Sequence, residues 1–316
     1  MKSVAITSRS FSKHPVLRNE VLKRYPDAKF NDEGLSLSDV SLIEFLQGYE
    51  KAIIALEIID ESILSELPDL KVIGKYGVGL DMIDLKALKN YGVKLGWLGG
   101  VNKRSVSELV VSFAINLLHR VEFASTEVKN GEWYQVKGRQ LSDCTVGILG
   151  CGHVGKDLVK LLKPFSCNIL AHDIINFNDF YQENNVSAVD IDELIQKSDI
   201  VTLHLPLDDS TKNIINKDRL QMMKKDAILI NLARGGLIDE DALKIVMQNN
   251  KIAGAALDVF EVEPPVNNEF ALMDNVLVTP HIGGSSEEAV LAMGMAAIEG
   301  LDNAKDPLSH KTNKNS

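Results

Sequence analysis

The feature that most constrains the fold is a regular alternation of short apolar runs with segments of helical periodicity along most of the chain. In the first hundred residues, Val- and Ile-rich runs occur at 3–7, 51–56, 70–76 and 92–98. A second series follows at 145–150, 167–173, 199–205, 226–233, 252–260 and 275–281. Because parallel strands that are covered on both faces have continuous apolar sequences, each series predicts a parallel sheet between helices.

The two series predict an α/β chain with two domains, since 316 residues exceed the usual size of one hydrophobic core. Six strands in one open sheet is the size of a dinucleotide-binding domain, which we expect at residues 102–284. A helical pattern at 285–303 follows the sixth strand and is predicted to return to the first sheet. Residues 1–101 and 285–316 then form a discontinuous substrate domain. Both sheets are expected to be doubly wound, with a cleft between the domains.

Charge and composition exclude several classes of partner. A formal net charge of -10 argues against a nucleic-acid surface, because phosphate binding needs a concentrated field of Lys and Arg. The first ten residues are too polar for a signal peptide, and no later run approaches the length of a membrane span, so we expect a cytoplasmic protein without membrane contact. Cys144, Cys151 and Cys167 lack CxxC spacing, and we expect neither a disulfide framework nor a metal site.

A glycine motif marks the candidate cofactor site. The GxGxxG sequence of residues 150–155 directly follows an apolar run and precedes a helical pattern. Gly150 permits a tight turn, Gly152 lets a pyrophosphate approach the backbone, and Gly155 lets helix and strand pack closely. Asp173 ends the next strand, where a carboxylate accepts the adenosine ribose hydroxyls and repels a 2′-phosphate. The motif therefore predicts NAD rather than NADP. A tightly packed strand-to-helix turn that binds nothing is the alternative.

Polar residues follow several of the later strands. Arg234 lies in NLARGG, Asp258 and Glu263 lie in or just after LDVF, and His281 ends VLVTPH. The carboxyl ends of strands in a doubly wound sheet face the ligand crevice, so we expect these side chains at one site. Taken singly, Arg234 could form a structural ion pair and His281 could be a structural histidine.

The blocks NLARGGLIDEDAL, GAALDVFEVEPP and VTPHIGGSSEEA resemble the D-isomer-specific 2-hydroxyacid dehydrogenase family, nearest to its phosphoglycerate dehydrogenase-like branch. The segment GVGLDMID at 77–84 resembles the substrate loop of that family, although Met82 stands where Asn is usual. The resemblance runs from about residue 70 to residue 300. It implies a Rossmann NAD-binding domain, a flavodoxin-like substrate domain, and hydride transfer between nicotinamide and a small 2-hydroxy or 2-keto acid of D configuration.

The resemblance also implies roles for the three polar residues. Arg234 would bind the substrate carboxylate and polarise the keto oxygen, and His281 would donate the proton to that oxygen. Glu263 would hydrogen-bond the imidazole of His281. Reduction of a ketone by hydride creates an alkoxide and needs a general acid, and a neighbouring carboxylate favours the protonated form of an imidazole.

Further site residues follow from the same resemblance. The substrate carboxylate would meet the backbone of Val78 and Gly79, while Lys75 would either meet a distal anionic group or be a solvated surface lysine. Asp258 would line the nicotinamide pocket and hold the carboxamide. The remaining expected cofactor contacts are His153, Val154, His204, Pro206, Ala233, His281 and Gly283.

Substrates like phosphoglycerate, hydroxypyruvate or glyoxylate are expected, and other functions stay open. One is an NAD-sensing regulator like the C-terminal binding protein corepressors, and another is a phosphonate dehydrogenase. A formate dehydrogenase is disfavoured, because those enzymes pair the histidine with Gln rather than Glu. A regulatory domain after the catalytic core is not expected. In the family, the arm before the glycine motif mediates dimers, so the resemblance implies a homodimer. The apolar and aromatic side chains between residues 121 and 141, including Phe123, Trp133 and Tyr134, fit such a buried surface.

Overall fold

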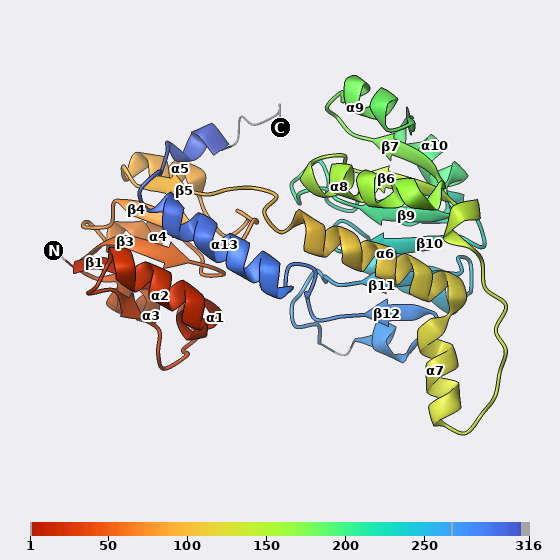
Figure 1. Ribbon diagram of the computed structural model, residues 1–316, viewed down its shortest axis with the longest axis horizontal. Helices are drawn as coiled ribbons and strands as arrows, with labels where there is room; N and C mark the ends of the chain where they lie inside the picture. The colour runs from red at the N-terminus through yellow and green to blue at the C-terminus, as the bar shows by residue number, and fades with distance from the viewer. Residues whose placement is uncertain (1, 267, 311–316) are drawn as a thin grey trace. The chain divides into compact units, whose positions relative to one another are not determined.

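The computed structural model describes residues 2–266 and 268–310, shown as a ribbon in Figure 1. The chain divides into a first unit with the bounds Met1–Asn102 and Ser286–Ser316 and a second unit with the bounds Lys103–Ser285. Each unit contains one parallel sheet with helices packed on it. The predicted α/β class with two parallel sheets is therefore confirmed.

The first unit is built on a sheet with the strand order β2-β1-β3-β4-β5, which is the flavodoxin-like order. Its strands are β1 (Lys2–Ile6), β2 (Lys29–Phe30), β3 (Tyr49–Ile54), β4 (Val72–Lys75) and β5 (Lys94–Gly96). Its helices are α1 (Arg9–Lys13), α2 (Pro15–Arg24), α3 (Asp39–Leu46), α4 (Glu61–Ser65), α5 (Leu85–Asn90), α13 (Glu287–Gly300) and the 3-10 turn η4 (Pro307–His310).

Helices cover both faces of this first sheet. In β1, Val4 and Ile6 belong to the apolar core that contains residues of α2 and α13. Ala5, which lies between them, belongs to the core that contains residues of α3, α4 and α5. This alternation is the period of two that a strand buried on both faces requires. Helix α13 also packs on β4, β5 and α2, as Figure 1 shows.

The second unit is built on a seven-stranded sheet with the order β12-β11-β10-β9-β6-β7-β8. Its strands are β6 (Thr145–Leu149), β7 (Asn168–His172), β8 (Val186–Ala188), β9 (Ile200–Leu203), β10 (Ile228–Asn231), β11 (Gly254–Leu257) and β12 (Val276–Val278). Strand β6 pairs with β7 on one side and with β9 on the other. The chain order reverses at β6, which makes the carboxyl end of this strand the expected ligand-binding point.

Helices of the second unit also lie on both faces of its sheet. They are α6 (Lys103–His119), α7 (Val121–Lys129), α8 (His153–Leu162), α9 (Asn178–Glu183), α10 (Ile191–Lys197), α11 (Lys217–Met222) and α12 (Glu240–Gln248). Short 3-10 turns occupy Leu141–Asp143, Lys163–Phe165 and Glu269–Leu272. The core with α6 and α8 takes Ile148 from β6, and the core with α10, α11 and α12 takes Leu149.

Two strands were not expected from the sequence. The prediction of six strands in the second sheet is wrong, because β8 adds a seventh, and β2 similarly adds a fifth strand to the first sheet. Both are edge strands of two or three residues, and in β8 only Val186 is buried. Such strands have no apolar run long enough to give a pattern.

Apart from η1, the stretch from Asn130 to Leu141 has no regular structure, in keeping with its lack of periodicity. None of the helices in the described residues combines the length and the apolar character needed to cross a bilayer.

Candidate active site

The glycine motif forms the turn between β6 and α8. Gly150 has φ +96, and its amide donates to the carbonyl of His172 at 2.8 Å. A Cβ at Gly155 would lie 2.3 Å from the Gly150 carbonyl oxygen, so protein packing requires glycine there. A Cβ at Gly152, the N-cap of α8, would meet no atom within 4 Å. The open space at Gly152 fits the close approach of a pyrophosphate to the helix N-terminus.

Asp173 lies beside this turn, directly after β7. One carboxylate oxygen accepts from the amide of Cys151 at 2.7 Å, and the other accepts from the amide of Ile175 at 2.9 Å. These two bonds fix the carboxylate next to the glycine turn, where an adenosine ribose would lie in a dinucleotide site. The residues of this turn therefore fit NAD.

His204 follows β9 on the other side of the same switch point. Its amide donates to the carbonyl of Leu149 at 2.8 Å, and its Nε2 lies 3.1 Å from the hydroxyl of Thr202. Burial lowers the pKa of His204 to about 3, so the imidazole is neutral at physiological pH. His153, the first residue of α8, also has a lowered pKa, mainly through burial and further through Lys103 and Lys156.

The loop after β10 carries Arg234. The side chain of Asn231 accepts from the amide of Ala233 at 3.1 Å and donates to the carbonyl of Arg234 at 2.8 Å. The Arg234 guanidinium donates to the carbonyl of Ala233 at 2.6 Å. A Cβ at Gly235 would lie 1.8 Å from the carbonyl oxygen of Phe260. Glycine is therefore needed for the Arg234 loop to lie against the chain that leads to Glu263.

Glu263 and His281 form a direct pair. The Nδ1 of His281 lies 2.7 Å from Oε2 of Glu263, and Oε1 of Glu263 accepts from the amide of Phe260 at 3.0 Å. The two side chains are half and about one third exposed. Within residues 2–266 and 268–310, Nε2 of His281 has no hydrogen-bond partner. The glutamate thus fixes the imidazole through one nitrogen and leaves the other for a ligand.

The carboxylate of Asp258 organises the loop that holds His281. It is fully buried and accepts from the hydroxyl of Thr279 at 2.5 Å and from the amides of Ile282 and Gly283, both at 2.7 Å. The backbone carbonyl of Asp258 accepts from the amide of His281 at 2.9 Å. Sequence reasoning expected Asp258 at the nicotinamide carboxamide, and it missed these contacts and those of Asn231. The only sequence signal for Asp258 and for Asn231 was a polar residue at the end of a strand.

Lys75, Val78 and Gly79 belong to the first unit, at the carboxyl end of β4. Lys75 is only 3% exposed and donates from Nζ to the carbonyls of Ala55 and Tyr76. The reading of Lys75 as a solvated surface lysine is therefore wrong. The indole Nε1 of Trp97 donates to the carbonyl of Val78 at 3.1 Å, a contact that the sequence did not predict. In the part of the chain that the structure describes, the amides of Val78 and Gly79 donate no hydrogen bond.

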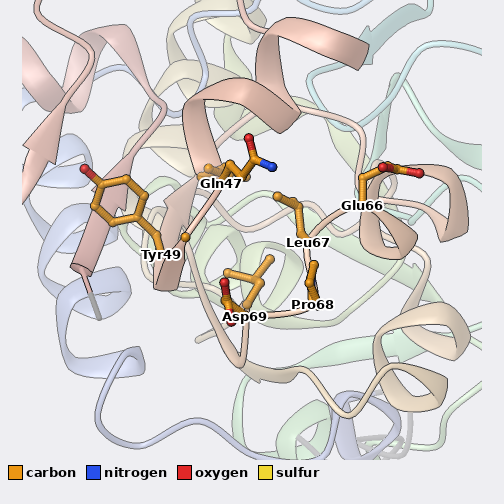
Figure 2. A pocket seen from close by; sticks show the side chains of 9 residues that line it. Gln47, Tyr49, Glu66, Leu67, Pro68 and Asp69 are labelled. Atoms are coloured by element: carbon orange, nitrogen blue, oxygen red, sulfur yellow. The ribbon is translucent and has the colours of Figure 1, made fainter.

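A small hollow of about 70 Å³ lies at the amino ends of β3 and β4 (Figure 2). Its lining includes Gln47 at the end of α3, Tyr49 at the start of β3 and the segment from Glu66 to Asp69 before β4. The expected ligand-binding residues all follow the carboxyl ends of strands, so this hollow at the amino ends is separate from them.

Comparison with known proteins gives the family. Residues 111–283 match the model of the D-isomer specific 2-hydroxyacid dehydrogenase NAD binding domain. The chain is 39% identical over 244 residues to a D-3-phosphoglycerate dehydrogenase of Methanocaldococcus jannaschii, covering 76% of this chain and 47% of the relative. It is 37% identical over 236 residues to a hydroxypyruvate reductase of Thermotoga maritima, covering 73% and 76%. The chain therefore spans about half of the first relative and about three quarters of the second.

A solved structure agrees with these matches. The D-lactate dehydrogenase of Aquifex aeolicus, complexed with NAD and lactic acid, superposes with a TM-score of 0.82 at 26% identity, covering 94% of this chain and 93% of that one. The NAD expected from the glycine motif is the cofactor of the matched domain, and the resemblance found in the sequence is confirmed. The chain belongs to the D-isomer-specific 2-hydroxyacid dehydrogenase family of NAD-dependent enzymes.

Proposed function

We propose that the protein reduces the keto group of a small 2-keto acid with NADH and, in reverse, oxidises the matching D-2-hydroxy acid. The observation that carries this proposal is the pairing of His281 with Glu263, which leaves Nε2 of the imidazole for a substrate. This pair lies in the unit that carries the NAD-binding turn. Phosphoglycerate and hydroxypyruvate, named by the relatives, and the simpler glyoxylate set the substrate class that we propose.

The residues divide the chemistry between them. When bound, NADH would supply the hydride for the keto carbon. The former keto oxygen gains negative charge, and Nε2 of His281 donates the proton that neutralises it. Glu263 accepts a hydrogen bond from Nδ1 and holds the imidazole in the orientation that leaves Nε2 for the substrate. The guanidinium of Arg234 binds the substrate carboxylate and polarises the keto oxygen, for which its forked donors are suited.

We further propose that the second unit holds the cofactor. Its contacts with NAD would include Val154, Pro206, Ala233 and Gly283. The first unit would bind the substrate carboxylate through the amides of Val78 and Gly79. Lys75 supports this role, because its buried ammonium places positive charge beside the loop that carries those amides.

The test is NADH consumption with glyoxylate, hydroxypyruvate and 3-phosphohydroxypyruvate. His281→Ala should lower kcat by on the order of 10² to 10⁴ fold while NADH binding survives. His119→Ala, at the end of α6 in the same unit, is the matched control and should keep wild-type turnover. NADH binding by the wild-type protein without turnover of any keto acid would favour an NAD-sensing regulator instead.

A homodimer is part of the same proposal. Helix α7 has no buried residue, and Trp133 and Tyr134 in the stretch that follows are 77% and 57% exposed. Exposed apolar side chains gathered in one segment mark interaction surfaces.

A cytoplasmic location is also proposed, because Cys144, Cys151 and Cys167 are all free thiols, as is usual in reducing compartments.

A further inference from the structure

We propose that Trp97 is a positioning residue that orients the amide of Gly79 toward the substrate carboxylate. This inference rests on the proposed function, in which the loop of residues 77–80 binds that carboxylate. Trp97 follows β5 directly, and its indole reaches across to the loop that follows β4.

The argument begins with the peptide that joins Val78 to Gly79. Its carbonyl oxygen accepts from Nε1 of Trp97 at 3.1 Å. A trans peptide is planar, so its N–H points away from its C=O. Fixing the carbonyl of Val78 therefore fixes the direction of the Gly79 amide. An indole has one donor and no acceptor, so this bond uses the whole hydrogen-bonding capacity of the Trp97 side chain.

The loop has little else to hold it. Gly77 has φ +119, a conformation that favours glycine, and glycine restricts the backbone less than other residues do. Among residues 2–266 and 268–310, no other hydrogen bond holds the backbone of Gly77, Val78 or Gly79. Within the described residues, the Trp97 indole is thus the one hydrogen-bond donor that restrains this loop, and it acts on the direction of the Gly79 amide.

Trp97 is itself held by the last turn of the described chain. The ring of His310, in η4, meets the indole edge to face, with centroids 5.5 Å apart and planes at 81°. Nε2 of His310 lies 2.9 Å from the carbonyl oxygen of Leu95 in β5. The turn η4 therefore packs against the indole of Trp97. Through this indole, a distant part of the sequence helps to position the loop of residues 77–80.

The test is Trp97→Phe, which keeps an aromatic ring against His310 and removes the donor. We expect the KM for glyoxylate to rise roughly five- to tenfold, the range that follows from losing one hydrogen bond. The kcat and the affinity for NADH should stay within about twofold, because the loss affects substrate binding uniformly in ground and transition states. Tyr91→Phe, at an exposed position of the same unit, is the matched control and should leave the KM unchanged.

A second measurement needs no substrate. In 15N relaxation, the order parameter of the Gly79 amide should fall in Trp97→Phe and stay at the wild-type value in Tyr91→Phe. His310→Ala should produce a smaller change in the same direction.

Three results would overturn the proposal. They are an unchanged KM for glyoxylate in Trp97→Phe, an unchanged order parameter at Gly79, and a parallel loss of NADH affinity that shows general unfolding. Failure of the proposed function is seen separately, as a wild-type protein that turns over no keto acid.

Discussion

His281 has φ +53, a conformation that residues other than glycine adopt rarely, and its neighbours account for it. Its amide donates to the carbonyl of Asp258 at 2.9 Å, and the Asp258 carboxylate accepts from the amides of Ile282 and Gly283 just beyond it. Such backbone strain persists only where the surroundings determine it fully. The buried carboxylate of Asp258 therefore helps to position His281, the proposed acid, and need not touch the substrate itself.

Asp258→Asn tests this positioning role. The amide group of Asn would bring donors against the amides of Ile282 or Gly283, and a displaced His281 should lower kcat by on the order of 10- to 100-fold. Binding of NADH, measured by fluorescence titration, should change little. Asp274→Asn, at an exposed position of the same unit, is the control. A variant that keeps its kcat and loses only NADH affinity would instead place Asp258 at the nicotinamide.

Glu263→Gln tests the hydrogen bond that fixes the imidazole. Oε2 of Glu263 lies 2.7 Å from Nδ1 of His281, and Oε1 accepts from the amide of Phe260 at 3.0 Å. A Gln side chain has only one acceptor oxygen, so it can keep at most one of these two contacts in the same form. We expect the loss of a fixed imidazole to lower kcat for keto-acid reduction by on the order of 10- to 100-fold, while NADH binding survives. A wild-type kcat in Glu263→Gln would contradict the positioning role of Glu263.

At the scale of elements, the sequence predicted what depends on local patterns. The long strands of both sheets have continuous apolar runs, and Arg234, Glu263 and His281 follow strand ends in the sequence as they do in the structure. The edge strands β2 and β8 are too short to give such a pattern.

Contacts between distant segments were not predictable in this way. The bond from Trp97 to Val78 joins two different loops, and the burial of Lys75 depends on the carbonyl of Ala55 after another strand. No spacing within one segment carries this information, because it arises only when the sheet brings the strand ends together.

Two glycines of one turn make a matched pair of variants. A methyl group at Gly152 would meet no protein atom, whereas at Gly155 it would lie 2.3 Å from the Gly150 carbonyl oxygen. Gly152→Ala should therefore keep its Tm within a few degrees and weaken NADH binding by roughly tenfold or more, since the methyl group takes the place of the pyrophosphate. Gly155→Ala should lower the Tm itself. Normal NADH binding by Gly152→Ala would show that the dinucleotide lies elsewhere.

At the scale of the whole molecule, the two units contribute different parts of the proposed chemistry. The second unit carries the NAD-binding turn and Arg234, Glu263 and His281, and the first unit carries the loop of Val78 and Gly79. In both, the proposed functional residues lie at or follow the carboxyl ends of parallel strands. Helix α7 and the stretch after it carry none of these residues, yet they leave apolar side chains exposed. The proposed chemistry therefore does not explain this exposure.

We explain that exposure by a homodimer and predict that α7 lies at its interface. Val121 and Val128 are 48% and 51% exposed and lie two helical turns apart, on one face of α7. Light scattering at micromolar concentration should give about twice the chain mass of 34.8 kDa. Val128→Asp should shift this mass toward the monomer, because a charge buried in an apolar interface is costly. Val40→Asp, at a valine 67% exposed on α3, is the control and should stay dimeric. A monomeric wild-type protein, or equal masses for the two variants, would show that the exposed face of α7 is not the interface.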